Sequence, residues 1–321
     1  MRHLKECRRL ISIISRHMST KEKILTTAAV SQKQNELFDQ EKRRQLDMVK
    51  RIEKITVHHV GQSHNCKLAM NKNLSTPYHV AMHFNETYTK RSAIALVNGK
   101  PWHMLQPLTE DCELRLVNMK DDDPKEANEA FWRSCSFMAG AILLNAFKTD
   151  VYIQPVRAAD IPVSQGCFAY DVNLPFPWDP SQEELTSLSR LAYELAEKKE
   201  PFERLEVRPS IAMDIFQDNE YKVAELNSMT ADRIVLFRLG QFIDVSPGPL
   251  VTNSGFMVPH RYSFTCVHHI EDHLKPGNKL TRFQGVALPS DFPCHYHTWN
   301  LIQGRAETPV TTDASSPLID S

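Results

Sequence analysis

Cysteine and histidine, the usual protein ligands of zinc, are concentrated in two short stretches near the end of this 321-residue chain. The segment FTCVHHI alternates like a strand, in which neighbouring side chains point to opposite faces, so adjacent histidines cannot share one ion. Neither stretch has the spacing of a known zinc site. We therefore expect no metal site and no cofactor, and exposed or hydrogen-bonded side chains at Cys266, His268, His269, His273, Cys294, His295 and His297.

The segment FIDVSPGPLV, residues 242–251, has the turn residues of a pocket rim but lacks a complete set of reactive groups. Asp244 and Ser246 supply oxygen atoms, yet no histidine lies beside Ser246 to activate its hydroxyl. The segment is therefore either a loop that never carried reactive groups or a catalytic loop that has lost them.

Positive charge is concentrated at the start of the chain. Residues 1–54 contain 14 Lys and Arg against 7 Asp and Glu, whereas the remainder contains 24 against 32. A body with that balance is not a general polyanion binder, so nucleic-acid contact should be local to the first segment. The candidates for contact with RNA phosphates in this segment are Lys42, Arg43, Arg44, Lys50 and Arg51. The alternative is that these residues form the solvated face of a helix.

Residues 1–20 have the pattern of a targeting segment. They contain five Arg and Lys and one acid, and apolar residues recur at helical spacing from Leu4 to Met18. This amphipathic, arginine-rich pattern predicts a mitochondrial presequence, placed at residues 1–30, and a location in the mitochondrial matrix. The alternative is an ordinary exposed helix. No apolar run approaches the roughly 20 residues of a membrane span, so we expect no membrane association.

Two groups of elements follow a predicted basic N-terminal helix at 31–54. In 55–119, two strands, a helix beginning at Thr76 and Pro77, and two strands around the Asn98–Gly99 turn predict a small β-grasp domain. In 125–305, the apolar helix ANEAFWRSCSFMAGAILLNAF, two further helices and several strands predict an α+β domain. Residues 306–321 are predicted to be a disordered tail.

Four blocks in this order resemble the N-terminal half of threonyl-tRNA synthetases, where a β-grasp domain of the TGS type precedes an editing domain. STPYHVAMHF resembles the family's SPxDVA, and WRSCSFMAGAI resembles HSCAHLLGHAI. GCFAYDVNL resembles GFYYDVDL, and FIDVSPGPLV resembles YVDMCRGPHV. The resemblance implies an α+β fold class, with a small β-grasp (TGS-like) domain followed by an editing-like α+β domain.

The residues that carry editing chemistry in that family are replaced here. The family's His-x-x-x-His pair aligns with Arg133 and Phe137, and its Cys-x-x-x-His pair aligns with Ser246 and Leu250. Arginine is no base near neutral pH, and phenylalanine and leucine offer neither a lone pair nor a titratable proton. The resemblance therefore implies an inactive domain, without catalytic residues and without a small-molecule substrate.

The chain also stops where the synthetases' class II catalytic core would begin, so we expect no charging reaction. Beyond about residue 30, segments such as ELFDQEKRRQL, MNKNLSTPY and RFQGV resemble synthetase-like constituents of the mitochondrial large ribosomal subunit. That resemblance implies a structural role in mitochondrial translation, with large-subunit ribosomal proteins as partners and limited rRNA contact. The alternatives are a tRNA-binding module and a trans-editing hydrolase derived from threonyl-tRNA synthetase.

Overall fold

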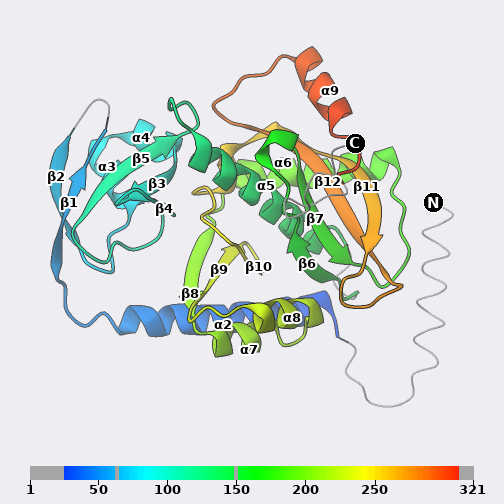
Figure 1. Cartoon of the computed structure of the whole chain (residues 1–321), viewed down its shortest axis with the longest axis horizontal. Coiled ribbons are helices and arrows are strands. Elements are labelled where there is room, and N and C mark those ends of the chain that lie inside the picture. Colours follow the sequence, from blue (N-terminus) through cyan, green and yellow to red (C-terminus); the bar gives the residue numbers. More distant parts are fainter. Residues whose placement is uncertain (1–24, 62–64, 148–150, 311–321) are drawn as a thin grey trace.

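The computed structural model describes residues 25–61, 65–147 and 151–310, which form a mixed α+β protein with three β-sheets (Figure 1). The predicted fold class is thus confirmed. Residues 1–24, most of the predicted presequence, lie outside the described part, as do residues 311–321 of the predicted tail. Within the described ranges, no helix has both the length and the apolar character needed to cross a bilayer.

The small domain contains one five-stranded mixed β-sheet. Its sheet runs in the order β2-β1-β5-β3-β4, with β1 and β5 parallel and the other neighbours antiparallel. Thr76 caps the helix of this domain, as predicted, and accepts a hydrogen bond from the His79 amide. The elements are β1 (Lys54–His59), β2 (Cys66–Asn71), α3 (Pro77–Phe84), α4 (Glu86–Arg91), β3 (Ser92–Val97), β4 (Lys100–Trp102) and β5 (Cys112–Asn118).

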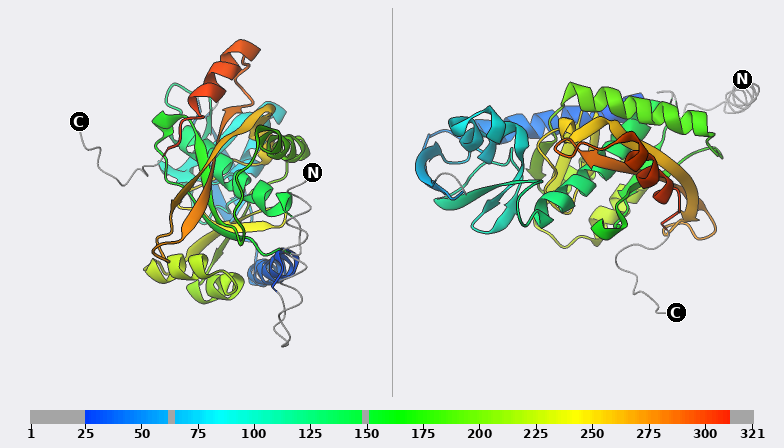
Figure 2. Two further views of the ribbon diagram at one scale, coloured as in Figure 1. Left: turned by 90° about the vertical axis from the view of Figure 1, so that its right-hand side faces the viewer. Right: turned by 90° about the horizontal axis from the view of Figure 1, so that it is seen from above.

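The larger part is built around α5 (Lys125–Ala146), which packs against both a four-stranded and a three-stranded antiparallel sheet. The first sheet, β11-β12-β7-β6, contains β6 (Gln154–Ala158), β7 (Phe168–Asn173), β11 (Met257–Glu271) and β12 (Lys279–Pro289). The second, β10-β9-β8, contains β8 (Glu203–Val207), β9 (Ile234–Leu239) and β10 (Phe242–Val245). The helices are α6 (Gln182–Lys198), α7 (Pro209–Phe216), α8 (Glu220–Ser228) and α9 (Tyr296–Arg305). Figure 2 shows α9 at one end of this part and α2, α7 and α8 at the other.

The N-terminal helix, α2 (Thr27–Asp47), packs on the larger part. The side chains of Ser31 and Asn35 both donate to the Gln241 carbonyl, at 3.2 and 2.9 Å. Phe38 is fully buried, and the guanidinium carbon of Arg238 lies 4.5 Å from its ring centroid. A polar helix that buries little by itself is thus held by strand β9 and by the backbone of the turn between β9 and β10.

Both ends of α2 differ from the prediction of a helix over 31–54. The helix begins at Thr27, whose hydroxyl donates to the Val151 carbonyl at 2.5 Å, and Val30 is buried. The predicted presequence boundary at residue 30 therefore falls inside an ordered helix. The helix ends at Asp47, and residues 48–53 connect it to β1.

The C-terminal boundary also differs, because residues 306–310 are held against β12. Thr265 Oγ1 and Gln284 Nε2 both donate to the Ala306 carbonyl, at 2.6 and 2.8 Å. The Val310 amide donates to Gln284 Oε1 at 2.8 Å. The prediction of disorder from residue 306 is wrong for these five residues, since buried side chains of the sheet satisfy their backbone.

We predict that Phe38→Ala lowers the free energy of unfolding by about 3–5 kcal/mol, because it leaves a cavity beneath Arg238. Leu46→Ala, on the exposed face of the same helix, should change it by at most about 0.5 kcal/mol. Equilibrium urea unfolding of the two variants measures the difference. Equal effects would contradict the docking of α2 on the larger part.

Candidate functional site

Helix α5 places the first two predicted site residues, Arg133 and Phe137, one turn apart. Arg133 Nε donates to the Pro249 carbonyl at 3.3 Å, and its Nη1 lies 3.6 Å from Glu129 Oε2. Its guanidinium also covers Gly248, where a Cβ atom would lie 2.9 Å from the Arg133 Cζ. Burial lowers the pKa of Arg133, while Glu129 acts to raise it. Arg133 thus closes the edge of the site as a cation and cannot act as a base.

Phe137 and Leu250 fill the interior of the site. Both are buried in the main hydrophobic core. The Phe137 ring makes edge-on contacts with Phe202, Phe237 and Phe242, at centroid separations of 5.9, 6.4 and 5.0 Å. The resemblance places imidazoles of the synthetase family at three positions, and apolar side chains occupy two of them here, so neither of these two side chains can bind a proton or a metal ion.

Ser246 uses its hydroxyl to close the turn. Its Oγ donates to the Gly248 carbonyl at 2.9 Å, inside the Ser-Pro-Gly-Pro segment. The structure also identifies a serine that sequence reasoning missed. Ser134 Oγ donates to the Ala130 carbonyl at 2.6 Å and accepts from the Val251 amide at 2.8 Å, which anchors this loop to α5. The serines of this region therefore serve the backbone geometry.

Asp244, which the sequence presents as an isolated acid, belongs to a buried ionic cluster. Lys222 Nζ lies 2.6 Å from Asp244 Oδ1 and 2.8 Å from Glu225 Oε2. The Tyr170 hydroxyl donates to Asp244 Oδ2, and the Val245 amide donates to Oδ1 at 2.7 Å. The cluster joins β7, α8 and β10, and neither Lys222 nor Tyr170 was singled out from the sequence.

Two members of this cluster, Lys222 and Tyr170, have raised pKa values. Burial opposes the charged form of Lys222, but Asp244 and Glu225 outweigh it and raise the lysine's pKa. Burial raises the pKa of Asp244, while Lys222 acts in the opposite direction. Burial, and then the Asp244 charge, raise the pKa of Tyr170 well above its ordinary value. Lys222 and Tyr170 therefore stay protonated at neutral pH, and the cluster is suited to holding strands together.

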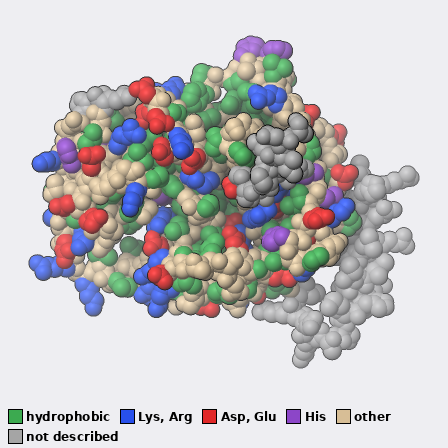
Figure 3. Space-filling view, viewed as in Figure 1, with side chains coloured by type: hydrophobic (Ala, Val, Ile, Leu, Met, Phe, Trp, Pro, Cys, Tyr) green, Lys and Arg blue, Asp and Glu red, His purple; other side chains and the backbone are tan. Residues whose placement is uncertain are grey.

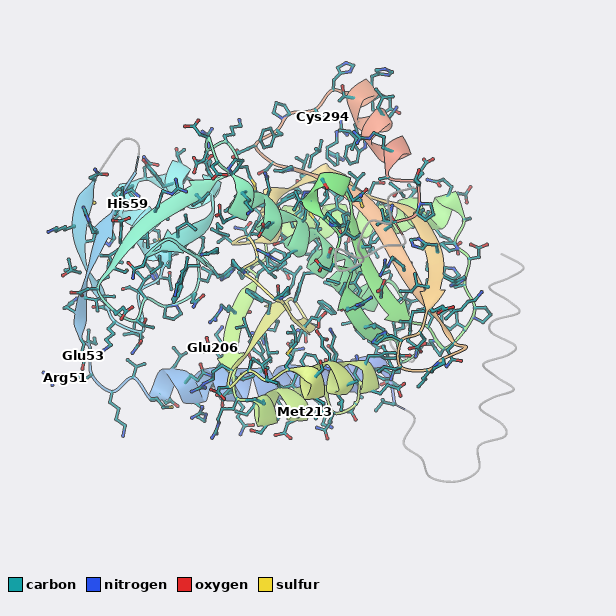
Figure 4. All side chains as sticks on the ribbon, viewed as in Figure 1. Arg51, Glu53, His59, Glu206, Met213 and Cys294 are labelled. Carbon is teal, nitrogen blue, oxygen red and sulfur yellow. The ribbon has the colours of Figure 1, made fainter. Side chains whose placement is uncertain are left out.

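The cysteine and histidine stretches lie apart from this site, on β11 and in the connection to α9, where Cys294 is marked in Figure 4. In the part of the chain that the structure describes, no group of three or more His, Cys, Asp or Glu side chains is placed to hold a metal ion. His268 pairs with Arg282 across the sheet, and His269 pairs with Thr281. Burial lowers the pKa of His268, and Arg282 acts in the same direction, which favours its neutral form.

The five candidate RNA-contacting cations divide into two groups. Lys42 Nζ lies 2.5 Å from Glu203 Oε2, and Arg44 Nε lies 2.6 Å from Glu41 Oε2, so both are paired within the protein. Arg43, Lys50 and Arg51 are exposed and form no ion pair with the described residues. Arg51 points away from the body (Figure 4), and Lys and Arg side chains gather over the end of α2 (Figure 3, lower left).

We predict that Lys222→Met lowers the free energy of unfolding at neutral pH by about 3–5 kcal/mol, because Asp244 stays buried without its cation. Lys90→Met removes the exposed Lys90–Glu86 pair, of similar 2.8 Å separation, and should have little effect.

The decrease in the free energy of unfolding caused by Lys222→Met should also depend on pH. Without Lys222, the folded-state pKa of Asp244 lies further above its unfolded-state value, and stability is lost as the pH rises through that folded-state pKa. The free energies of unfolding of the variant and the parent should therefore differ less near pH 4 than near pH 7. This interval begins at roughly the ordinary pKa of an aspartate. Urea unfolding across this range measures the effect, and a constant difference would contradict the assignment.

Comparison with known proteins supports both resemblances. No family model matches the chain. The chain is 29% identical over 237 residues to cytoplasmic threonine–tRNA ligase 1 of Homo sapiens, covering 73% of this chain and 30% of the ligase. It is 26% identical over 267 residues to mitochondrial threonine–tRNA ligase 1 of Arabidopsis thaliana, covering 82% and 36%. The chain thus spans about a third of the length of these ligases.

The chain is also similar to a ribosomal protein, and this similarity covers nearly the whole of both chains. It is 38% identical over 295 residues to large ribosomal subunit protein mL39 of Drosophila melanogaster. The match covers 90% of this chain and 88% of the relative, so it extends over nearly the full length of both. The chain belongs to the family of large ribosomal subunit protein mL39.

Proposed function

We propose that this protein is a structural constituent of the mitochondrial large ribosomal subunit, a synthetase-derived scaffold without catalysis that supports mitochondrial translation. The near full-length similarity to a large ribosomal subunit protein carries the proposal. The arginine-rich pattern of residues 1–20 supports delivery to the mitochondrial matrix. In this proposal the presequence ends before Thr26 rather than at residue 30, because the Thr26 side chain caps α2.

In this proposal the chain keeps the synthetase architecture and has lost its chemistry. Residues 55–119 form the TGS-like β-grasp domain, and the inactive editing-like domain begins at about residue 125 and extends to residue 310. The apolar filling at Phe137 and Leu250 disfavours a trans-editing hydrolase, because their side chains occupy the place of the reactive groups. The paired cations of α2 similarly leave few groups to neutralise RNA.

We predict that the purified protein releases no serine from mischarged threonine tRNA above the uncatalysed rate. Arg133, Phe137, Ser246 and Leu250 supply neither a general base nor an activated nucleophile. A deacylation assay with an intact threonine–tRNA ligase as the positive control makes the measurement. Release that depends on the protein would revive the trans-editing alternative.

Attachment to the subunit should rest mainly on protein neighbours, with a small rRNA contribution from Arg43, Lys50 and Arg51. Each phosphate contact contributes about −0.9 to the slope of log affinity against log salt on duplex nucleic acid, so these three groups account for about −3 at most. The other cations of α2 are committed to Glu203, Glu41 and, through Lys33, to Asp218.

The test is co-sedimentation with mitochondrial large subunits through gradients of increasing salt. The protein should stay bound at salt concentrations that release strongly basic rRNA binders. Replacing Arg43, Lys50 and Arg51 with alanine should reduce the salt slope by about 3 at most. Replacing the exposed small-domain cations Lys67, Lys100 and Arg115 is the matched control and should leave the slope unchanged.

Two outcomes would count against the proposal. Absence of the wild-type protein from large subunits would overturn the assigned function. Release at moderate salt together with the basic rRNA binders would show that RNA electrostatics, and not protein neighbours, hold the chain.

A further inference from the structure

The connection between α2 and β1 exposes large apolar side chains. Met48 is 65% exposed and Ile52 is 63% exposed, and Leu46 in the last turn of α2 is 55% exposed. Residues 48–53 belong to no helix or strand, and none of the three side chains joins a hydrophobic cluster of the described residues. Burial within this fold therefore does not account for their apolar character.

The same stretch carries positive charge that the fold does not neutralise. Between residues 43 and 53, Arg44 is committed to Glu41 and Glu53 is committed to Lys72. The remaining charged side chains, which form no ion pair with the described residues, are Arg43, Asp47, Lys50 and Arg51. Three cations thus stand against one acid, and we call residues 43–52 the basic connector.

The basic connector is held in a defined shape at the surface. Arg44 Nη1 donates to the Met48 Sδ at 3.2 Å, while its Nε bonds Glu41 at 2.6 Å. The Lys50 amide donates to the Met48 carbonyl at 3.0 Å, which turns the chain out of α2. Arg51 then points away from the body (Figure 4). The apolar groups and the cations are therefore presented outward together, before any partner binds.

This mixture of charge and apolar surface decides which class of partner fits. The core of a protein–protein interface is depleted of charged residues, and of lysine in particular. Here Lys50 and Arg51 lie two residues and one residue from Ile52, so the apolar side chains form no charge-free patch. An RNA strand offers phosphates beside the faces of its bases, and those faces are accessible where the bases are unpaired. Unpaired RNA therefore matches both features of the connector.

We propose that the basic connector binds an unpaired stretch of rRNA in the mitochondrial large subunit, with its three free cations at phosphates and Met48 and Ile52 against a base. The inference rests on the proposed function and names the form of RNA at its limited rRNA contact. Methionine and isoleucine side chains contact bases as apolar wedges in other nucleic-acid complexes.

Salt separates the two kinds of contact in this proposal. Each phosphate contact on a single strand contributes about −0.7 to the slope of log affinity against log salt, so three contacts contribute about −2. Packing of Met48 and Ile52 against a base releases no counterions, so it should strengthen binding equally at every salt concentration.

Release from purified large subunits in washes of increasing salt measures both effects. The double variant Met48→Ser, Ile52→Ser should leave about tenfold faster than the wild type at every salt concentration, because it loses the apolar contact alone. Replacement of the three free cations with alanine should lower the slope by about 2. Met82→Ser is the matched control, since Met82 is 59% exposed on the small domain, and it should be released like the wild type.

The free proteins provide a check on folding. The double variant changes only exposed side chains, so its Tm should equal that of the wild type within about 1 °C. Release of this variant at the wild-type rate would refute the contact of Met48 and Ile52 with a base. Faster release that changes the salt slope as well would show that the two residues act through the cations, which would also refute it.

Photocrosslinking in assembled subunits identifies the partner. A diazirine-bearing side chain at position 52 of the full chain reacts with RNA and with protein alike. It should crosslink to rRNA nucleotides that are unpaired, and the same group at position 82 should not reach those nucleotides. A crosslink from position 52 to a protein or to a regular rRNA duplex, or no crosslink in subunits that contain the protein, would overturn the proposed contact. Failure of the wild type itself to enter large subunits would instead refute the proposed function.

Discussion

The need to shield helix α5 from water on almost every side determines the arrangement of the larger part. From Ser134 to Ala146 the helix has no charged side chain, and 13 of its 22 residues are buried. One sheet can cover only one side, so β7 and β10 lie against it from different sheets, and β3 of the small domain covers a further part. The small domain therefore shares the main core, to which it contributes Ala93 and Val117.

A side chain of the small domain strengthens this junction. His103 is fully buried and lies with its Nε2 3.4 Å from the Val251 carbonyl, beside the ring of Phe237. Burial lowers its pKa to about 3, so the imidazole is neutral at physiological pH. A neutral ring suits this dry contact between the two domains, because a charged one would carry a large desolvation cost. The apolar site around Phe137 and Leu250, the loop at residues 246–251 and the small domain thus pack together without a break.

An editing pocket in this position would have to interrupt that core with polar, water-accessible groups. Phe137 and Leu250 extend the core across the position instead, and Arg133 covers its edge. The ionic cluster of Lys222 and Asp244 still fixes the strand that leads into the turn, although no reactive group follows it. Under the proposed function, this segment keeps the shape of the loop in the synthetase family without its reactive groups, as expected where a fold supplies geometry and particular side chains supply function.

Local signals predicted much of the fold, whereas contacts between distant segments could not be predicted. Thr76 and Pro77 start a helix and the Asn98–Gly99 turn adopts positive φ, because caps and turns depend on neighbouring residues. Helices α8 and α9 were missed, since each is short and has weak apolar periodicity. The ordered conformation of residues 306–310 could not be predicted, because it depends on hydrogen bonds from the side chains of Gln284 and Thr265, which lie on earlier strands, to the Ala306 carbonyl.

The composition of the site could be predicted only in part. The positions of Arg133, Phe137, Ser246 and Leu250 came from the family resemblance, and their side-chain chemistry already argued against catalysis. Their surroundings could not be predicted, since the Lys222–Asp244 pair and the Ser134 anchor join residues that only the folded chain brings together. The division of the α2 cations likewise depends on Glu203, about 160 residues away from Lys42.

The position of α2 has a consequence for the order in which the chain can fold. Its side chains bond to Gln241, a residue 210 positions after Ser31, and its neighbouring strands begin only at Glu203. A chain that emerges from its N-terminus, from a ribosome or through a membrane channel, exposes α2 long before those strands exist. Helix α2, the first in the described part of the chain, is thus among the last to reach its final place, and until then it is an accessible segment for chaperones and processing proteases.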